Sequence, residues 1–342
     1  MKRSPVTLRD IAKEVGVHTS TVSRILNPET RHKYAPEMAE RVSLAAQKMG
    51  YRPNPIAYGL KTNRSMTVGV IIPDLTNPVF PPIIRGIENT LSEAGITTLL
   101  GDSDNNPDRQ RTILSRMKSR WVDGIILASA KLKDDLVTEC RKDGTPVVLI
   151  NRTTNQENVL SVVNDDCLGI KLAVRHMKQL GHRRIAHVAG PLEYSTGYDR
   201  YQGFLEAMKQ EGLEPNPALI GYSLAYSEEA GQQAFEPLLA SGEPFTGVIA
   251  ANDLIAMGVY NALQNRGIRC PEDISVSGFN DMPFVNKLRP PLTTLRIQHY
   301  EMGARAAQLL LRQMRNEENE ELLVHLKPEL IVRGSTAQAA KG

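Results

Sequence analysis

The sequence predicts a small, all-helical head of helix-turn-helix type, followed by an α/β body of two doubly wound parallel-sheet lobes. Three observations support this fold class. Residues 1–50 contain short amphipathic helical segments, residues 67–150 alternate apolar strands with helices, and the alternation restarts after residue 160. A chain of 342 residues is too long for one ordinary core, which agrees with a division into several domains.

The charge is distributed unevenly along the chain. Residues 1–64 hold 12 lysines and arginines against 5 acidic residues, whereas the other 278 residues hold 29 against 33. A basic head on a slightly acidic body is typical of a protein whose head binds nucleic acid, although a solvated basic surface would give the same balance.

Several classes of protein are disfavoured by the composition. No apolar segment follows the basic N-terminus, so we expect no signal peptide, and no run of 18 apolar residues predicts a membrane span. Three dispersed cysteines without a C-x-x-C motif predict neither a disulfide framework nor a zinc site. We therefore expect a cytoplasmic protein with no metal and no cofactor.

Helical spacing predicts the first helix of the head at about residues 7–15. Thr7 at its start and Asp10 three residues later have the spacing of a capping box, and Gly16 supplies the turn that follows. Another helix is expected at about residues 36–49, because a proline stands in its first turn and a glycine follows its end.

The helix between them, expected at about residues 19–26, is the candidate recognition helix. Val22 and Ile25 give it an apolar inner face, while its outer face carries hydroxyl groups and Arg24. Arginine can read a guanine edge in the major groove, and hydroxyl groups reach phosphates or bases. An ordinary solvated helix face is the alternative, but the basic head and the glycine turn favour DNA binding.

A linker follows the head. Asn54 and the proline after it can start a short helix at residues 55–61. An isolated helix of this length is unstable in water, and Gly59 weakens it further. We therefore expect residues 54–66 to form a hinge helix and linker that stays disordered until a partner holds it.

The body alternates strands and helices. In its first half, strands are expected near residues 67–73, 97–101, 124–127 and 147–150, with helices at 82–94, 108–119 and 133–142. In its second half, strands are expected near residues 161–163, 184–188, 247–251 and 274–278, with helices at 168–180, 198–211, 228–240, 254–266 and 299–315 and terminal strand-like stretches at 322–328 and 329–334. Strands that are apolar on both faces and separated by helices indicate parallel sheets covered on both sides.

These elements predict four parts of the chain. They are the head (1–53), the hinge and linker (54–66), a first lobe (67–164 and 296–320) and a second lobe (165–295 and 321–342). Ligands of doubly wound sheets bind at the carboxyl ends of the strands. The polar residues that directly follow the strands are therefore the candidates for a ligand site between the lobes.

Eight stretches occur in a fixed order along nearly the whole chain. They are "TLRDIAKEVGVHTSTVSRILN", "MGYRPNPIAYGL", "VGVIIPDLTNPVF", "WVDGIIL", "GHRRIAHVAGP", "VIAANDLIAMGV", "DISVSGFND" and "PPLTTLR". Because it contains these stretches in this order, the chain resembles the LacI/GalR family of bacterial repressors. The resemblance implies a homodimer that binds near-palindromic operator DNA and a periplasmic-binding-protein-like body that binds a small effector. It also implies repression of an operon for carbohydrate metabolism.

The resemblance implies DNA contacts in the head and hinge. The candidate DNA-binding residues are Thr7, His18, Thr19, Ser20, Thr21, Ser23, Arg24, Asn27, Asn54, Ala57 and Leu60. Of these, Thr19, Ser20 and Arg24 match the base-reading positions of the family. His18 stands where the family usually has serine. Leu60 matches a leucine that wedges into a minor-groove step, and its alternative role is that of a linker residue packed on the body.

The resemblance also implies effector contacts between the lobes. The candidate effector-binding residues are Phe80, Asn151, Arg152, Asn164, Thr196, Arg200, Tyr226, Asn252, Asn280 and Asp281. Amide groups suit sugar hydroxyls, arginine suits an oxygen or carboxylate, and an aromatic ring covers an apolar sugar face. Asn280 stands where many family members have aspartate. With fewer carboxylates near Arg200 and Arg152, the effector is expected to be a sugar or a sugar acid, although a strand-end cap is the alternative for any single residue.

Other functions remain open at this stage. A sensor of purines or sugars that represses only with its ligand bound is one alternative. A solute-binding protein would lack an export signal and leave the basic head unexplained. A sugar-processing enzyme would depend on Asp253 and Asp281 as paired carboxylates, since the Walker A, G-x-S-x-G and H-E-x-x-H motifs are missing from the sequence.

Overall fold

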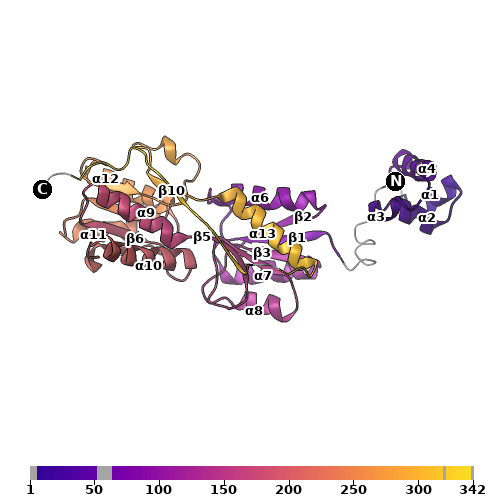
Figure 1. Ribbon diagram of the computed structural model, residues 1–342, viewed down its shortest axis with the longest axis horizontal. Helices are drawn as coiled ribbons and strands as arrows, with labels where there is room; N and C mark the ends of the chain where they lie inside the picture. The colour runs from indigo at the N-terminus through magenta and orange to yellow at the C-terminus, as the bar shows by residue number, and fades with distance from the viewer. Residues whose placement is uncertain (1–5, 52–63, 319–320, 340–342) are drawn as a thin grey trace. The chain divides into compact units, whose positions relative to one another are not determined.

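The computed structural model describes residues 6–51, 64–318 and 321–339. The chain divides into two compact units, a head of residues 1–65 and a body of residues 66–342 (Figure 1). Each unit has its own buried apolar core. Over the described ranges, no helix combines the length and the apolar character that a membrane span requires.

The described part of the head consists of helices. They are α1 (Leu8–Val15), α2 (Thr19–Ile25), α3 (Pro28–Arg31) and α4 (Pro36–Met49). Ile11 of α1, Val22 of α2 and Val42 of α4 are completely buried and form the centre of the head core. Gly16 ends α1 in the left-handed conformation, with φ of 73°, which a residue without Cβ adopts at little cost.

Helix α3 differs from the expectation for this stretch. No helix was expected between α2 and α4, but the backbone N–H groups of Thr30 and Arg31 donate to the carbonyl oxygen of Asn27 and close a helical turn. A helix of four residues is too short to show a hydrophobic period, and a proline at its first position is compatible with either a turn or a helix.

The first lobe is a parallel sheet with helices on both faces. Its elements are β1 (Thr67–Ile72), α6 (Phe80–Glu93), β2 (Thr97–Asp102), α7 (Pro107–Ser119), β3 (Gly124–Leu127), α8 (Asp135–Lys142), β4 (Val147–Ile150), β5 (Leu160–Asn164), α13 (His299–Met314) and β11 (Leu323–Leu326). The strand order is β11-β5-β4-β3-β1-β2. Alternate residues of β1 face opposite ways: Val70 packs in the core with α6 and α13, and Ile71 in the core with α7 and α8.

The C-terminal segment does not belong to the second lobe alone, as the sequence had indicated. Residues 321–342 were assigned to the second lobe, but β11 forms the edge of the first sheet, where Leu323 pairs with Ser161 in parallel register. The side chains of β11 are exposed or half-buried along its length. An edge strand of this kind has too weak an apolar pattern to indicate which sheet it joins.

The second lobe has a smaller parallel sheet. Its elements are α9 (Asp166–Gln179), β6 (Ile185–Ala189), α10 (Ser195–Gln210), β7 (Ile220–Tyr222), α11 (Glu228–Ala240), β8 (Gly247–Ala250), α12 (Asp253–Asn265) and β9 (Ser275–Ser277), with short 3-10 helices at Pro217–Leu219 and Val285–Lys287. The strand order is β7-β6-β8-β9. Helix α9 packs on α10, and α11 packs on α12. The parallel sheets of both lobes, with the helical head, confirm the predicted fold class.

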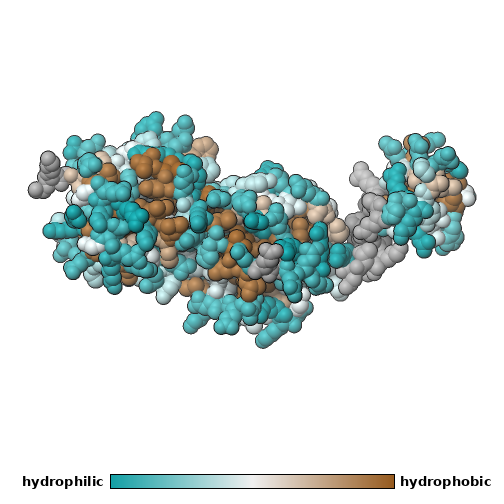
Figure 2. All heavy atoms as spheres, in the orientation of Figure 1, coloured by the Kyte–Doolittle hydropathy of each residue, from teal (hydrophilic) through white to brown (hydrophobic). Residues whose placement is uncertain are grey.

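Two antiparallel strands lie where the chain passes between the lobes. Strand β10 (Thr294–Arg296) pairs with β12 (Glu329–Ile331), and Figure 1 shows β10 where the chain passes from the second lobe to the first. Neither β10 nor β7 was expected, because neither contains the run of consecutive aliphatic residues that marks the longer strands. Figure 2 shows that hydrophilic side chains cover most of the visible face of the body, with apolar side chains gathered over each lobe.

Candidate functional site

The outer face of α2 presents polar side chains. Ser20 and Arg24 are exposed, while Val22 and Ile25 on the other side of the helix are buried. No ion pair engages the guanidinium group of Arg24 within the described part of the chain. The hydroxyl residues Thr19, Thr21 and Ser23 are half-buried beside them. The helix therefore offers an exposed guanidinium group and several hydroxyl groups to a partner outside the head.

His18 caps the start of α2. Its Nδ1 atom accepts a hydrogen bond from the backbone N–H of Ser20 at 3.2 Å and lies 2.8 Å from the Ser20 hydroxyl oxygen. A neutral imidazole can thus replace the serine oxygen that usually satisfies such an N–H group. His18 fixes both the start of α2 and the position of the Ser20 side chain.

The other candidate DNA-binding residues lie in different surroundings. Thr7 is exposed, and its N–H and hydroxyl groups both donate to the carboxylate of Asp10, which holds the pKa of Asp10 below its ordinary value. Asn27 is half-buried and starts α3. Asn54, Ala57 and Leu60 lie outside the described residues.

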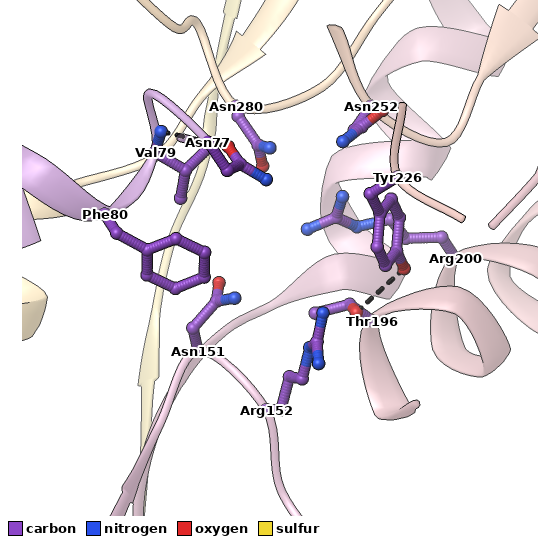
Figure 3. A pocket seen from close by; sticks show the side chains of 10 residues that line it. All are labelled: Asn77, Val79, Phe80, Asn151, Arg152, Thr196, Arg200, Tyr226, Asn252 and Asn280. Atoms are coloured by element: carbon purple, nitrogen blue, oxygen red, sulfur yellow. Dashed lines mark hydrogen bonds between the residues drawn. The ribbon is translucent and has the colours of Figure 1, made fainter. Parts of the chain in front are cut away.

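A pocket lies between the two lobes of the body (Figure 3). It encloses about 300 Å³ of space, part of which is open to solvent. Its lining residues are Asn77, Val79, Phe80, Asn151, Arg152, Thr196, Arg200, Tyr226, Asn252 and Asn280. Eight of the ten candidate effector-binding residues are thus brought together, although they are spread from residue 80 to residue 280.

The fold explains this convergence. Asn151 and Arg152 follow β4, Asn252 follows β8, and Asn280 follows β9. Because the carboxyl ends of parallel strands lie at one edge of a sheet, polar residues in these positions meet in the cleft. Figure 3 shows Phe80 approaching from one side of the pocket and Tyr226 from the other. The pocket therefore combines aromatic walls with amide, hydroxyl and guanidinium groups.

The asparagines of the pocket are held in specific conformations. Asn252 caps α12, since its side-chain oxygen accepts from the N–H of Ile255 at 2.9 Å. Its amide nitrogen points toward the pocket in Figure 3. Asn151 and Asn280 have φ values of 64° and 115°, in the region that residues with a Cβ rarely adopt. Strained backbone of this kind is often found at ligand sites, where it aims a side chain.

Arg200 already has partners within the protein. It is 2% exposed, and its guanidinium group donates to Asp166 at 2.9 Å and to the carbonyl oxygen of Ala251 at 2.7 Å. The group also stacks on Phe279, 3.8 Å from the ring centroid. Burial raises the pKa of Asp166, although Arg200 acts in the opposite direction. Arg200 and Asp166 thus form a buried ion pair whose guanidinium group borders the pocket.

Arg152 has no such carboxylate partner within ion-pair distance in the described ranges. It is 4% exposed, and its guanidinium group lies 3.8 Å from the ring centroid of Tyr194 and 5.7 Å from that of Tyr226. Its buried Nε and Nη1 atoms have no hydrogen-bond partner among the described residues. Burial lowers the pKa of this guanidinium group, because a charged group is poorly solvated there.

Two candidate effector-binding residues do not line this pocket. Asn164 is buried at the end of β5, and neither polar atom of its amide has a hydrogen-bond partner in the described chain. Asp281 accepts hydrogen bonds from Arg296 at 2.8 Å and from Arg333 at 2.6 Å. These bonds engage both oxygens of its carboxylate with the segments of the chain that cross between the lobes.

The pocket also contains two residues that were not among the candidate effector-binding residues. Asn77 and Val79 lie in the loop between β1 and α6, where the side-chain oxygen of Asn77 accepts from the N–H of Val79 at 3.1 Å. Their position in the loop after β1 was the feature of the sequence that could have identified them as pocket residues. Several polar residues follow β1, and the sequence does not say which of them turns toward the second lobe.

Comparison with known proteins agrees with both parts of this site. Residues 7–54 match the family of bacterial regulatory proteins of lacI type, and residues 174–336 match the periplasmic binding protein-like domain. The HTH-type transcriptional repressor CytR of Escherichia coli (strain K12) is 33% identical over 336 residues, which cover 98% of this chain and 97% of CytR.

Two solved structures are similar over nearly the whole chain. The lac repressor dimer bound to operator and the anti-inducer ONPF has a TM-score of 0.86 and 25% identity, and the match covers 98% of this chain and 100% of that one. The complex of the transcriptional regulator CelR with cellobiose has a TM-score of 0.75 and 29% identity, with 96% and 99% covered.

Proposed function

Because the chain belongs to the LacI family of bacterial regulatory proteins, we propose that it represses transcription as a homodimer whose hold on DNA depends on a small effector. Two heads related by a two-fold axis would bind a near-palindromic operator. The observation that carries this proposal is the outer face of α2, where Ser20 and Arg24 project from a basic head. The relative in the lac repressor structure is a dimer bound to operator.

The effector is proposed to be a sugar or a sugar acid that binds between the lobes and serves a carbohydrate-related operon. The pocket supports this, since amide and hydroxyl groups face an aromatic ring from the opposite lobe (Figure 3). A ligand held by both lobes changes their relative orientation, and this changes the spacing of the heads in the dimer. Coupling of this kind is reciprocal and typically on the order of 1–3 kcal/mol.

A catalytic role is not part of the proposal. Asp253 and Asp281 were the carboxylates on which an enzymatic function would depend. Asp253 is fully buried and accepts hydrogen bonds from Thr294 and from the N–H of Met282, and Asp281 is held by two arginines. Neither lines the pocket. A repressor of bacterial operons acts on chromosomal DNA, so we place the protein in the cytoplasm.

Selection from a pool of random DNA duplexes tests the proposal. The full-length protein should enrich one near-palindromic sequence, and the affinity for this sequence should exceed that for scrambled DNA by about 1000-fold or more at physiological salt. Adding candidate effectors to the selected complex should change its affinity. Binding that is weak, independent of sequence and abolished by moderate salt would refute the proposal.

A further inference from the structure

The pocket contains a buried arginine that forms no ion pair within the described ranges. Arg152 is almost completely buried, and two of its guanidinium nitrogens lack hydrogen-bond partners among the described residues. The guanidinium group makes cation–π contacts with the rings of Tyr194 and Tyr226. A buried charge with so few partners is costly, so structures rarely retain one unless a ligand completes its surroundings.

Three carboxylates of the second lobe that lie beside pocket residues are engaged elsewhere. Asp166 binds Arg200, Asp281 binds Arg296 and Arg333, and Asp253 accepts from Thr294. Glu193, next in sequence to Tyr194, pairs with Lys131 at 2.7 Å. The lining of the pocket itself includes no aspartate or glutamate. Of the two arginines in the lining, Arg152 is therefore the one without a carboxylate at ion-pair distance in the described ranges, and Glu193 acts on it only from farther away.

We propose that the effector is an anion and that an oxygen of its carboxylate or phosphate group binds the guanidinium group of Arg152. This inference rests on the proposed function, in which the pocket between the lobes holds the effector. It names the chemical class of that effector and the residue that selects it. A carboxylate or phosphate oxygen accepts charge-assisted hydrogen bonds from the free Nε–H and Nη1–H groups, which a sugar hydroxyl satisfies less well.

The other pocket residues indicate the kind of molecule to which the anionic group is attached. In Figure 3, Arg152 and Thr196 lie at one end of the pocket, and Asn252 and Asn280 lie at the other. Amides at that second end suit hydroxyl groups, and Phe80 suits an apolar ring face. The ligand class is thus a sugar acid or a sugar phosphate.

Isothermal titration of the full-length protein with matched compounds tests this assignment. The acids are D-gluconate, D-galacturonate and glucose 6-phosphate, and the neutral controls are glucose and galactose. At least one acid should bind more tightly than every neutral sugar. Comparing the affinities of gluconate and glucose 6-phosphate shows whether the site prefers a carboxylate or a phosphate group. If a neutral sugar binds as tightly as the best acid, the inference is wrong.

The variant Arg152→Met separates a ligand-binding role from a structural one. Methionine fills a similar volume without a charge, so affinity for the acid should fall on the order of 10- to 100-fold, and by more than the affinity for any neutral sugar. The thermal unfolding midpoint without ligand should be unchanged or raised, because an unpaired buried charge is removed. A lowered midpoint with unchanged acid affinity would overturn the inference.

Two further variants serve as controls. Arg200→Met removes a paired arginine and leaves Asp166 buried alone, so its unfolding midpoint should fall. Arg175→Met removes a half-exposed arginine that pairs with Glu211 on the surface of the second lobe, so it should change neither acid binding nor the midpoint appreciably. Together they show whether the response of Arg152→Met is specific to an unpaired arginine.

Failure of this inference can be distinguished from failure of the proposed function. A protein that selects an operator and responds to a neutral sugar through the pocket keeps the proposed function and refutes the anionic effector. A protein that selects no operator refutes the proposed function, whatever it binds. If adding the acid changes the affinity for the selected operator, and Arg152→Met loses this response, the proposed function and the anionic effector are both supported.

Discussion

At the scale of single residues, Arg24 is the exposed cation on the outer face of α2. If it reads a guanine edge, Arg24→Ala should cost about 1–3 kcal/mol in operator affinity and relax specificity at one base pair. A gel-shift or anisotropy titration against operators mutated at single positions measures both effects. Equal losses at every position would show that Arg24 contacts only the phosphate backbone.

Arg24→Lys is the matched control for this prediction. Lysine keeps the charge but lacks the planar fork that binds two acceptors at once. The salt dependence of binding should therefore stay close to that of the unchanged protein, while discrimination at the same base pair is lost. A lysine variant that kept full discrimination would indicate that charge alone matters at this position.

Asp253 gives a prediction about pH. It is completely buried, and desolvation raises its pKa to about 7, although Thr294 and the N–H of Met282 donate to it. A carboxyl group whose pKa is raised on folding contributes most stability below its unfolded pKa, near 3.8, and loses it as the pH rises through the folded value. The contribution of Asp253 to the unfolding free energy should therefore fall between about pH 4 and pH 7.

Asp253→Asn tests this prediction by removing the ionisation. The amide can still accept from the N–H of Met282 and donate to the Thr294 hydroxyl oxygen. Urea unfolding of both proteins at several pH values should give a difference in free energy that shifts in favour of the asparagine variant as the pH rises. A difference that does not vary between pH 4 and pH 7 would contradict the proposed origin of the shift.

At the scale of elements, α2 depends on an unusual cap. His18 satisfies the N–H of Ser20, so His18→Ala should lower the stability of α2 by about 0.5–2 kcal/mol. Amide hydrogen exchange should accelerate in α2 and leave the helices of the body unchanged. Operator affinity should fall with it, because the base-reading side chains are then less well fixed.

His18→Ser is the companion variant. A serine hydroxyl is one of the preferred helix caps, so this change should restore slow exchange in α2. If serine protected the helix no better than alanine, the hydrogen bonds of His18 would not be what stabilises it. The pair therefore separates the capping role of His18 from any direct contact with a phosphate.

At the scale of the whole molecule, the head and the body are separate compact units. Each has its own buried core, so a fragment of residues 66–342 should fold, dimerise and bind the effector without the head. Analytical ultracentrifugation and titration with the best ligand of the full chain check this. A fragment that unfolds or binds more than tenfold more weakly would place the domain boundary elsewhere.

The sequence by itself determined features that depend on neighbouring residues. The helices of the head follow from apolar spacing, a capping residue and Gly16, and the lobes follow from buried strands that alternate with helices. Much of the pocket was predictable for the same reason, since residues such as Asn151 and Asn252 directly follow strands that form a parallel sheet. Some short elements, such as β7 and α3, carried too little pattern.

The tertiary structure decided how distant side chains pair. Both arginines of the pocket were candidates in sequence, but only the fold shows that Arg200 binds Asp166, 34 residues away, and that Arg152 has no such partner in the described chain. The fold likewise pairs Asp281 with Arg333, 52 residues away, and places β11 in the first sheet. Charge pairing and edge-strand pairing depend on contacts across the fold, which local spacing does not encode.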